Sequence, residues 1–222
     1  MISVAIDGPA GAGKSSLSRK AAENLGFIYV DTGALYRTVG YKFSQKGANT
    51  DLNCDIEGIL ADTTVDIRFV NGEQRVFLDG SDVSDKIRTP EASMMASAVS
   101  AKPPVRAFLL EMQRRLAKEN NVVMDGRDIG TVVLPNATVK IYLTASAEKR
   151  AERRYKELLE KGTTVTLKEV YDDMVQRDYN DMHREIAPLK QAPDAVVVDT
   201  TECDLDESLN LLLKTIKDNL KK

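Results

Sequence analysis

A glycine-rich stretch near the start of the chain constrains its fold more than any other feature. The apolar run Val4-Ala5-Ile6 ends at Asp7 and opens into GPAGAGKS, residues 8–15, which matches the pattern G-x-x-x-x-G-K-[ST]. From residue 14 the apolar spacing becomes helical. In such a strand–loop–helix unit, backbone N–H groups turn inward and the helix dipole points at phosphate oxygens. The stretch therefore predicts a phosphate-binding loop at the carboxyl end of a buried strand.

The loop also supplies two side chains that suit a nucleoside triphosphate. Lys14 is expected to reach the β- and γ-phosphates, and the Ser15 hydroxyl is expected to ligate Mg²⁺. The loop therefore predicts a site for a nucleoside triphosphate with Mg²⁺. Its residues are Gly8, Pro9, Ala10, Gly11, Ala12, Gly13, Lys14, Ser15 and Ser16.

A second candidate for the metal site lies at residues 121–131, NVVMDGRDIGT. Here a short apolar strand ends in Asp125. A carboxylate in that place can hold Mg²⁺ directly or through water, as in other phosphate-loop proteins. A plain polar loop after the strand is the alternative.

Composition favours an enzyme that acts on small molecules. The 222 residues suit one α/β domain with an insertion, and the net charge of −3 creates no field that would attract nucleic acid or an anionic membrane. Residues 1–7 lack the basic segment of an export signal, and no run approaches the ~20 apolar residues that span a bilayer. Cys54, Cys203 and the single His183 are too scattered for a zinc site or a disulfide framework, which fits a reducing cytoplasm.

The order of predicted elements implies a parallel sheet wound on both sides. Helices are expected over 14–25, 90–100, 104–120 and 167–179, with apolar strands between them. Residues 63–90 instead alternate and carry Asn71-Gly72 and Asp79-Gly80, which predicts an inserted antiparallel meander. We expect one domain over 1–222, with a core of about 1–60, 100–150 and 190–222, an insertion at about 61–99 and a lid at about 150–185.

Several polar residues remain ambiguous on pattern alone. Arg37 follows the strand expected at 27–30 by one turn, so a solvated arginine and a ligand-binding one are equally good interpretations. Ser97 and Arg106 flank the break made by the adjacent prolines at 103–104, where ordinary surface positions are the simpler explanation.

Arg150, Arg153 and Arg154 fall on one face of the helix expected after residue 146. Glu152 and Glu157 offer them ion-pair partners, so a solvated, ion-paired face is one reading. An arginine lid that closes over the triphosphate is the other.

Four motifs together resemble one family. They are GPAGAGKSS at 8–16, DTGALYR at 31–37, DGRDIGT at 125–131 and the stretch from Arg177-Asp178 to REIAPL at 184–189. In this order they resemble the bacterial cytidylate kinases, which belong to the nucleoside monophosphate kinases with a phosphate loop. The resemblance covers essentially the whole chain, including the predicted meander. The phosphate loop is widely shared, but DTGALYR and DGRDIGT together are far more specific.

The resemblance implies a fold, an activity and an assembly. The fold would be α/β, a P-loop NTPase-type parallel sheet flanked by helices, with a small antiparallel subdomain that binds the nucleoside monophosphate and a helical lid that carries arginines. The activity would be ATP-dependent phosphorylation of CMP and dCMP with Mg²⁺, and residues 8–16 would bind ATP, the phosphoryl donor. The family also implies a monomer, and no long heptad seam suggests otherwise.

Site roles follow from the resemblance, position by position. Arg37, Arg127 and Arg184 would hold the acceptor phosphate. Ser97, Arg106 and Asp128 would read cytosine, and Arg177 and Asp181 would contact the sugar. The residues implied for substrate binding are Thr32, Arg37, Ser97, Arg106, Arg127, Asp128, Arg177, Asp181 and Arg184. Those implied for catalysis are Lys14, Arg127, Asp128, Arg150 and Arg154, with Ser15 and Asp125 at the metal.

Two positions depart from some members of that family. Thr32 stands where some members have serine, and it keeps the hydroxyl. Ser15-Ser16 stands where some members have Gly-Thr, so either hydroxyl could meet Mg²⁺.

The chemistry of cytosine agrees with these roles. Cytosine presents an N4 amino donor where uracil presents an acceptor, so the carboxylate of Asp128 would favour the first and repel the second. Arg106 could donate to the acceptors elsewhere on the ring. Arginines suit the phosphate because their planar fork grips its oxygens and stays charged.

Three other interpretations remain open. A kinase for another small acceptor would share the loop but would not account for DGRDIGT or the meander. A GTPase-type switch would need an N-K-x-D guanine motif, which the sequence lacks. A nucleotide-binding protein without catalysis would bind ATP and release no ADP when an acceptor is added.

Overall fold

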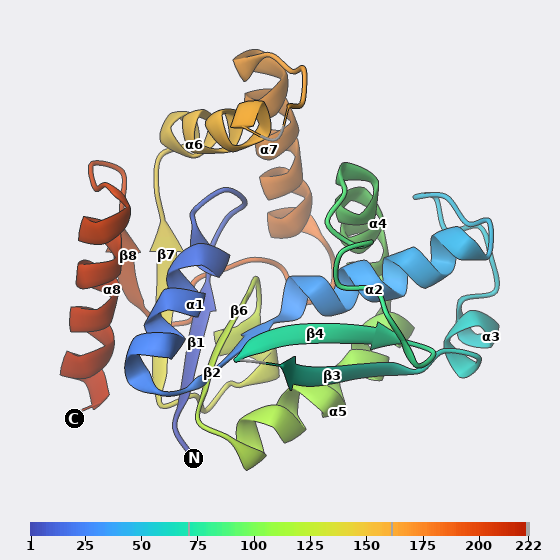
Figure 1. The fold of residues 1–222 in the computed structure, drawn as a ribbon, viewed down its shortest axis with the longest axis horizontal. Helices are drawn as coiled ribbons and strands as arrows, with labels where there is room; N and C mark the ends of the chain where they lie inside the picture. The colour runs from blue at the N-terminus through green and yellow to red at the C-terminus, as the bar shows by residue number, and fades with distance from the viewer. Residues whose placement is uncertain (71, 161, 221–222) are drawn as a thin grey trace.

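The computed structural model describes residues 1–70, 72–160 and 162–220, and its centre is a five-stranded parallel sheet (Figure 1). The strand order is β2-β6-β1-β7-β8. These strands are β1 (Ser3–Asp7), β2 (Ile28–Asp31), β6 (Val122–Gly126), β7 (Val139–Thr144) and β8 (Val196–Asp199). The register pairs Ile6 and Asp31 with Asp125, so the acidic ends of β1, β2 and β6 lie at one edge of the sheet.

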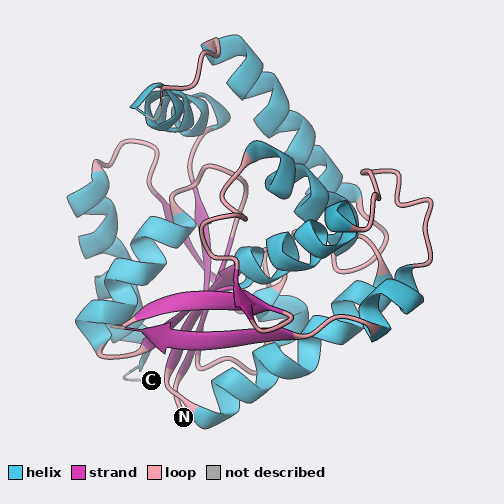
Figure 2. Ribbon diagram, turned by 45° about the vertical axis from the view of Figure 1, so that its right-hand side comes forward, coloured by secondary structure: helices cyan, strands magenta, loops and turns pink. Residues whose placement is uncertain are grey.

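Helices cover both faces of this sheet, as expected for strands that are apolar throughout (Figure 2). Successive side chains of β1 point to opposite faces of the sheet and pack against different helices. Val4 and Ile6 pack with α1 (Lys14–Leu25) and α8 (Leu205–Leu220), whereas Ala5 faces α5 (Pro103–Glu119). The same face carries a π-helix, η1 (Ile129–Val133).

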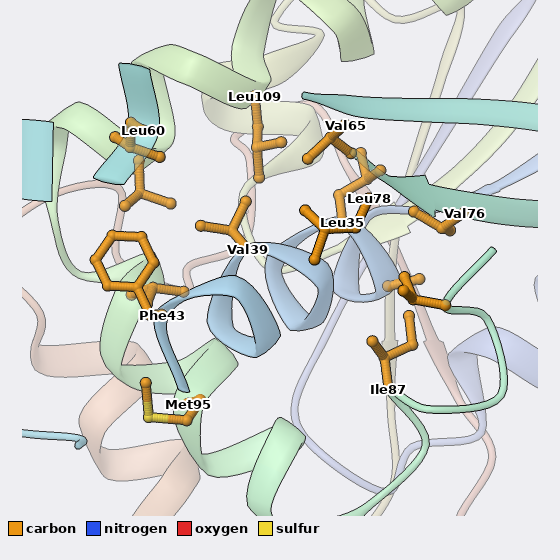
Figure 3. Packing of buried hydrophobic residues seen from close by; sticks show 14 of the residues in the cluster. Leu35, Val39, Phe43, Leu60, Val65, Val76, Leu78, Ile87, Met95 and Leu109 are labelled. Carbon is orange, nitrogen blue, oxygen red and sulfur yellow. The ribbon is translucent and has the colours of Figure 1, made fainter. Parts of the chain in front are cut away.

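A separate apolar core lies beside the sheet and joins the insertion to the rest of the domain (Figure 3). Its axis is α2 (Thr32–Gln45), whose Leu35, Val39 and Phe43 are fully buried, as their i, i+4, i+8 spacing predicts. Around α2 pack the small antiparallel sheet and the helices on either side of it. These elements are α3 (Ile56–Ala61), β3 (Val65–Val70), β4 (Glu73–Leu78), β5 (Ser81–Asp82) and α4 (Pro90–Ser100).

One glutamine ties the insertion to the central sheet. The side chain of Gln74 in β4 accepts from the N–H of Asp31 at 2.8 Å and donates to the carbonyl of Asp31 at 3.3 Å. It thereby satisfies both backbone groups at the end of β2, much as a neighbouring strand would.

Two further helices, α6 (Ala147–Glu160) and α7 (Leu167–His183), cross above the loop between β1 and α1 (Figure 1). Ala151 and Met174 on these helices form a small apolar cluster with Ala10 of that loop. Helices α6 and α7 therefore contact the glycine-rich loop directly.

Most predicted elements are confirmed. The helices at 14–25 and 90–100 have the predicted ends, and the helix expected at 104–120 runs from Pro103 because proline is well placed at the first helical position. The helix expected to end at 179 continues to His183. The meander is present, although Asn71 of its first predicted turn lies outside the described residues.

Two elements, α3 and η1, were not predicted. Both are short, with six and five residues, so their sequences hold too few turns to show a periodicity. Across the described residues, none of the helices combines the length and the apolar character needed to cross a membrane.

Candidate active site

The phosphate loop has the backbone conformation that its glycines permit. Gly11 and Gly13 have φ of 70° and 80°, in the left-handed region that favours glycine. A Cβ at Gly8 would overlap the carbonyl oxygen of Leu143 in β7, so only glycine fits there. The loop is thus pressed against the sheet at its start and turns directly into α1 at Lys14.

Lys14 lies beneath this loop with only 6% of its surface exposed. Its Nζ donates to the carbonyl of Pro9 at 2.6 Å. Burial, and then the charge of Arg127, lowers the pKa of Lys14 to about 7, although Asp125 and Asp181 oppose the shift. The amine is therefore held in a desolvated place, where a phosphate oxygen would be an effective partner.

Asp125 ends β6 and organises the floor of the site. Its carboxylate accepts from Ser15 Oγ at 3.0 Å and from the Tyr29 hydroxyl at 2.9 Å, and Thr32 Oγ1 donates to its carbonyl at 2.7 Å. Burial and the charge of Asp31 raise the pKa of Asp125 to about 6, against the influence of Lys14. Ser15 and Asp125, which the sequence pairs only by motif, are thus in direct contact.

This pair fits Mg²⁺. Hydroxyl and carboxylate oxygens are the ligands that Mg²⁺ takes in proteins, and it completes its shell with water and phosphate oxygens. Tyr29 was not predicted as part of this group. Its apolar neighbours in β2 made it look like a core residue, and only the pairing of β2 with β6 brings its hydroxyl to Asp125.

Asp7 is a second buried carboxylate that the sequence did not assign to the site. It accepts from the N–H groups of Ile129 and Gly130, both at 2.7 Å. Burial raises its pKa to about 6, although these two hydrogen bonds and Lys14 oppose the shift. Asp7 therefore fixes the start of η1, immediately after Arg127 and Asp128. Its place at a strand end before the glycine-rich loop was the available signal.

A cluster of opposite charges is centred on Asp128, which is 4% exposed. One carboxylate oxygen accepts from Arg106 Nη2 and the other is 3.3 Å from Arg184 Nη2. Burial raises the pKa of Asp128, and the two arginines oppose that shift. Arg106 also donates to the carbonyl of Ser100 at 3.1 Å. Arg106 is thus buried beside Asp128, and the simpler expectation of a surface position was wrong.

Asp181 extends the cluster toward the phosphate loop. Its carboxylate accepts from Arg127 Nε at 2.8 Å and lies 3.8 Å from Arg184 Nη1. Burial disfavours the charge of Arg127, but Asp181 and the other nearby carboxylates outweigh it and raise the Arg127 pKa.

A cleft of about 430 Å³ opens beside this cluster, between α4 and α7. Ser97, Arg177, Asp181 and Arg184 all line it, so the structure brings together four of the residues predicted to bind substrate. Burial, and then the charge of Arg127, lowers the pKa of Arg177. The remaining lining residues are Thr50, Met94, Ala98, Ala101, Asp173, Gln176 and Asn180.

Arg37 lies at the other side of the site, on the first turns of α2. Its Nη2 donates to Asp31 at 2.9 Å, and Asp31 also caps α2 through the N–H of Ala34. The Nε of Arg37 is buried and has no hydrogen-bond partner among the described residues. A buried donor of this kind is costly unless a partner reaches it, which favours the ligand-binding interpretation of Arg37.

The three arginines of α6 separate in the structure. Arg150 is 7% exposed and donates to the carbonyls of Ala10 and Ala145. Arg153 instead binds the carbonyls of Thr200 and Cys203 beyond β8. Arg154 is more exposed and pairs with Glu157 at 2.7 Å. Of the three, only Arg150 touches the phosphate loop.

The glycine-rich loop between β1 and α1, the buried lysine and the acidic end of the neighbouring strand define a nucleotide-binding protein of the P-loop class, with the layout of a small-molecule kinase. The family model for cytidylate kinase matches residues 4–218. The chain belongs to the cytidylate kinase family.

Named relatives agree with this assignment. A cytidylate kinase of Caldicellulosiruptor bescii is 52% identical over 213 residues, covering 96% of this chain and 94% of that protein. One from Thermosipho africanus is 46% identical over 218 residues, covering 98% and 96%. A crystal structure of an uncharacterised protein from Eubacterium ventriosum has a TM-score of 0.54 at 12% identity, covering 98% of this chain and 99% of that one, and is a likeness of fold alone.

Proposed function

We propose that this protein transfers the γ-phosphoryl group of ATP to CMP or dCMP, forming CDP or dCDP and ADP. One observation carries the proposal. The phosphate loop lies beside a buried cluster in which Asp128 is held between Arg106 and Arg184, in a chain of the cytidylate kinase family. A donor site and a charged acceptor site thus adjoin at the carboxyl end of one sheet.

On the donor side, the loop from Gly8 to Ser16 would bind the phosphates of ATP through its backbone and through Lys14. Ser15 and Asp125 would hold Mg²⁺, which neutralises charge on the triphosphate when bound. Both are oxygen ligands in contact at 3.0 Å. Asp125 is buried and Ser15 is exposed, so the pair would offer Mg²⁺ one fixed carboxylate and one accessible hydroxyl.

On the acceptor side, Arg37, Arg127 and Arg184 would hold the phosphate of CMP. Two anionic phosphates must come within bonding distance, so several fixed cations are needed to offset their repulsion. A phosphate oxygen of CMP then attacks in line, and no protein nucleophile is required. Positioning and electrostatics supply the rate.

The base and sugar would be held by groups around the cleft. Asp128 would accept from the N4 amino group of cytosine, since a carboxylate has lone pairs left after binding two arginines. Arg106 and Ser97 would complete the recognition of the base, and Arg177 and Asp181 would contact the sugar.

In the lid, Arg150 and Arg154 would stabilise the transferring phosphoryl group. Arg150 is already at the tip of the loop, through its bond to Ala10, whereas Arg154 lies one turn further along α6. We also propose that the insertion at about 61–99 binds the monophosphate, that the lid spans about 150–185, and that the protein is a cytoplasmic monomer. Thr32, the first residue of α2, would take part in substrate binding, and its hydroxyl ties that helix to the carbonyl of Asp125.

The test is a coupled ADP-release assay with Mg·ATP and a panel of CMP, dCMP, UMP, AMP, GMP and small sugar acids. Turnover confined to CMP and dCMP, with weak UMP, is the expected result. Turnover with a sugar acid alone would mean that the acceptor is a sugar acid, while the proposed ATP site would stand. If no acceptor increases the rate of ADP release, the proposed reaction is contradicted.

A further inference from the structure

Three hydrogen bonds clasp the tip of the phosphate loop to the two lid helices. The N–H of Ala10 donates to Asp178 Oδ1 at 2.8 Å, and the Ala10 carbonyl accepts from Arg150 Nη1 at 2.7 Å. The same Nη1 donates to Asp178 Oδ2 at 2.5 Å. This ring is called the Ala10 clasp below. Asp178 has no role in the function proposed above, and the resemblance assigned it none although it lies at the start of one of the four motifs.

The clasp is buried and packed. Ala10, Arg150 and Asp178 are 5%, 7% and 7% exposed. Beside them Met174 presses on Gly11, where an added Cβ would lie 2.5 Å from its sulfur. An ion pair in such a place is sensitive to the loss of one partner, because the other charge is then left buried and unpaired.

The helix that carries Asp178 also reaches the acceptor site. Asp181 and Arg184 follow at three-residue steps, and they bind Arg127 and Asp128 respectively. The distance along α7 from Asp178 to Arg184 is about 9 Å at 1.5 Å per residue. One short piece of helix therefore holds the donor loop at one end and the groups proposed to bind CMP at the other.

We propose that Asp178 is a positioning residue that couples the two sites. By holding the loop tip and α7 as one body, it lets a nucleotide in the phosphate loop favour the arrangement of Asp181 and Arg184 that the acceptor needs. The inference rests on the proposed function for the identity of the acceptor. Coupling of this kind is reciprocal, so each ligand must raise the affinity for the other by the same factor.

The experiment measures the dissociation constant of CMP by calorimetry, with and without a non-hydrolysable ATP analogue and Mg²⁺. In the unaltered chain the analogue is expected to tighten CMP binding by about 5-fold or more, the lower end of ordinary coupling. Asp178→Asn keeps an oxygen for the Ala10 N–H but loses the ion pair with Arg150. We expect it to bring the ratio close to 1 while CMP alone still binds.

Asp172→Asn is the matched control, since it makes the same change on the same helix at an exposed residue that pairs with Lys168. It should leave the ratio unchanged. A ratio near 1 in the unaltered chain, or an unaltered ratio in Asp178→Asn, would overturn the proposal.

A second variant serves if Asp178→Asn does not fold, as judged by circular dichroism. Arg150→Lys keeps the cation but cannot fork between Ala10 and Asp178, so it must also lower the ratio, and an unchanged ratio would overturn the proposal. If the panel above identifies another acceptor, the same ratio is measured with that acceptor. Failure of the coupling and failure of the proposed substrate are thereby distinguished.

Discussion

The donor and acceptor sides of the site are built in different ways. The proposed donor side comes from one contiguous stretch, residues 8–16, which supplies mostly backbone groups, and from Asp125 on the strand beside it. The proposed acceptor side comes from side chains on α2, α4, α5, α7 and the segment after β6. A backbone site is readable as a motif, whereas a side-chain site depends on packing.

The two sides also differ in how their cations are held. Arg106, Arg127 and Arg184 are each paired with a buried carboxylate. Lys14 instead donates to a carbonyl, and its pKa falls to about 7. The arginines proposed to bind the acceptor are therefore held in place by ion pairs before a ligand arrives. Burial disfavours the charged form of Lys14, so a bound phosphate would restore that charge.

The largest expected effect is on the donor side, from Lys14→Ala. Loss of a buried cation that meets the transferring phosphates should lower kcat by about 10²–10³-fold or more. The measurement is the coupled ADP-release assay with saturating CMP. Lys214→Ala, an exposed lysine on α8, is the control and should be unchanged. Near-normal turnover in Lys14→Ala would contradict the proposed mechanism.

Next comes specificity, on the acceptor side. Asp128→Ala should reduce the preference for CMP over UMP by about 10- to 100-fold in kcat/KM, because one good base contact is worth about 1–3 kcal/mol of discrimination. The KM for ATP should change much less. Equal losses on the base preference and on ATP would mean that Asp128 supports the whole site and does not read the base.

A smaller effect is expected from Asp125, through the pH dependence of the free energy of unfolding. The folded pKa of Asp125 is about 6 against 3.8 for the free group, so the folded chain keeps a proton that the unfolded chain loses. Its contribution to stability is present below about pH 4 and is lost as pH rises to about 6. Asp125→Asn should therefore flatten this part of the stability curve and raise the free energy of unfolding at pH 8 by roughly 1–2 kcal/mol.

Urea unfolding between pH 4 and pH 8 measures this change. The pKa of Asp7 is also raised to about 6, so the free energy of unfolding of the variant should still fall with pH, although less steeply. Turnover should fall even as stability rises, since a group proposed to hold Mg²⁺ is lost. A variant less stable than the parent at pH 8 would show that the hydrogen bonds of Ser15 and Tyr29 to the carboxylate outweigh its burial.

The smallest effect is expected at Thr32, whose hydroxyl ties α2 to the carbonyl of Asp125. Thr32→Ser keeps that hydrogen bond and should change the free energy of unfolding by less than about 0.5 kcal/mol. Thr32→Val removes it and should cost about 1 kcal/mol, because a buried carbonyl loses its donor. Thermal unfolding of the pair measures the difference. Equal stability would mean that the carbonyl finds another partner.

Most residues of the proposed donor side can be named from the sequence alone, although Tyr29 and Asp7 were not. The glycines, lysine and serine of the loop lie within nine consecutive residues, and their spacing follows from the local backbone conformation. The motif can therefore be recognised without knowledge of long-range packing. The spacing of Leu35, Val39 and Phe43 likewise indicated a helix, and these three side chains form the buried face of α2. For the acceptor side, the sequence supplied candidates through family resemblance, and the residues alone left Ser97, Arg106 and Arg37 open.

The partners of these residues were decided by the tertiary structure alone. Asp7 with Gly130, Arg106 with Asp128 and Asp178 with Ala10 are separated by 123, 22 and 168 positions. No local pattern encodes such pairs, because they form only when strands pair and helices pack. The chain by itself determined a phosphate loop on a parallel sheet. The packing of α5, η1 and α7 over the ends of the strands decided which buried charged groups pair beside that loop.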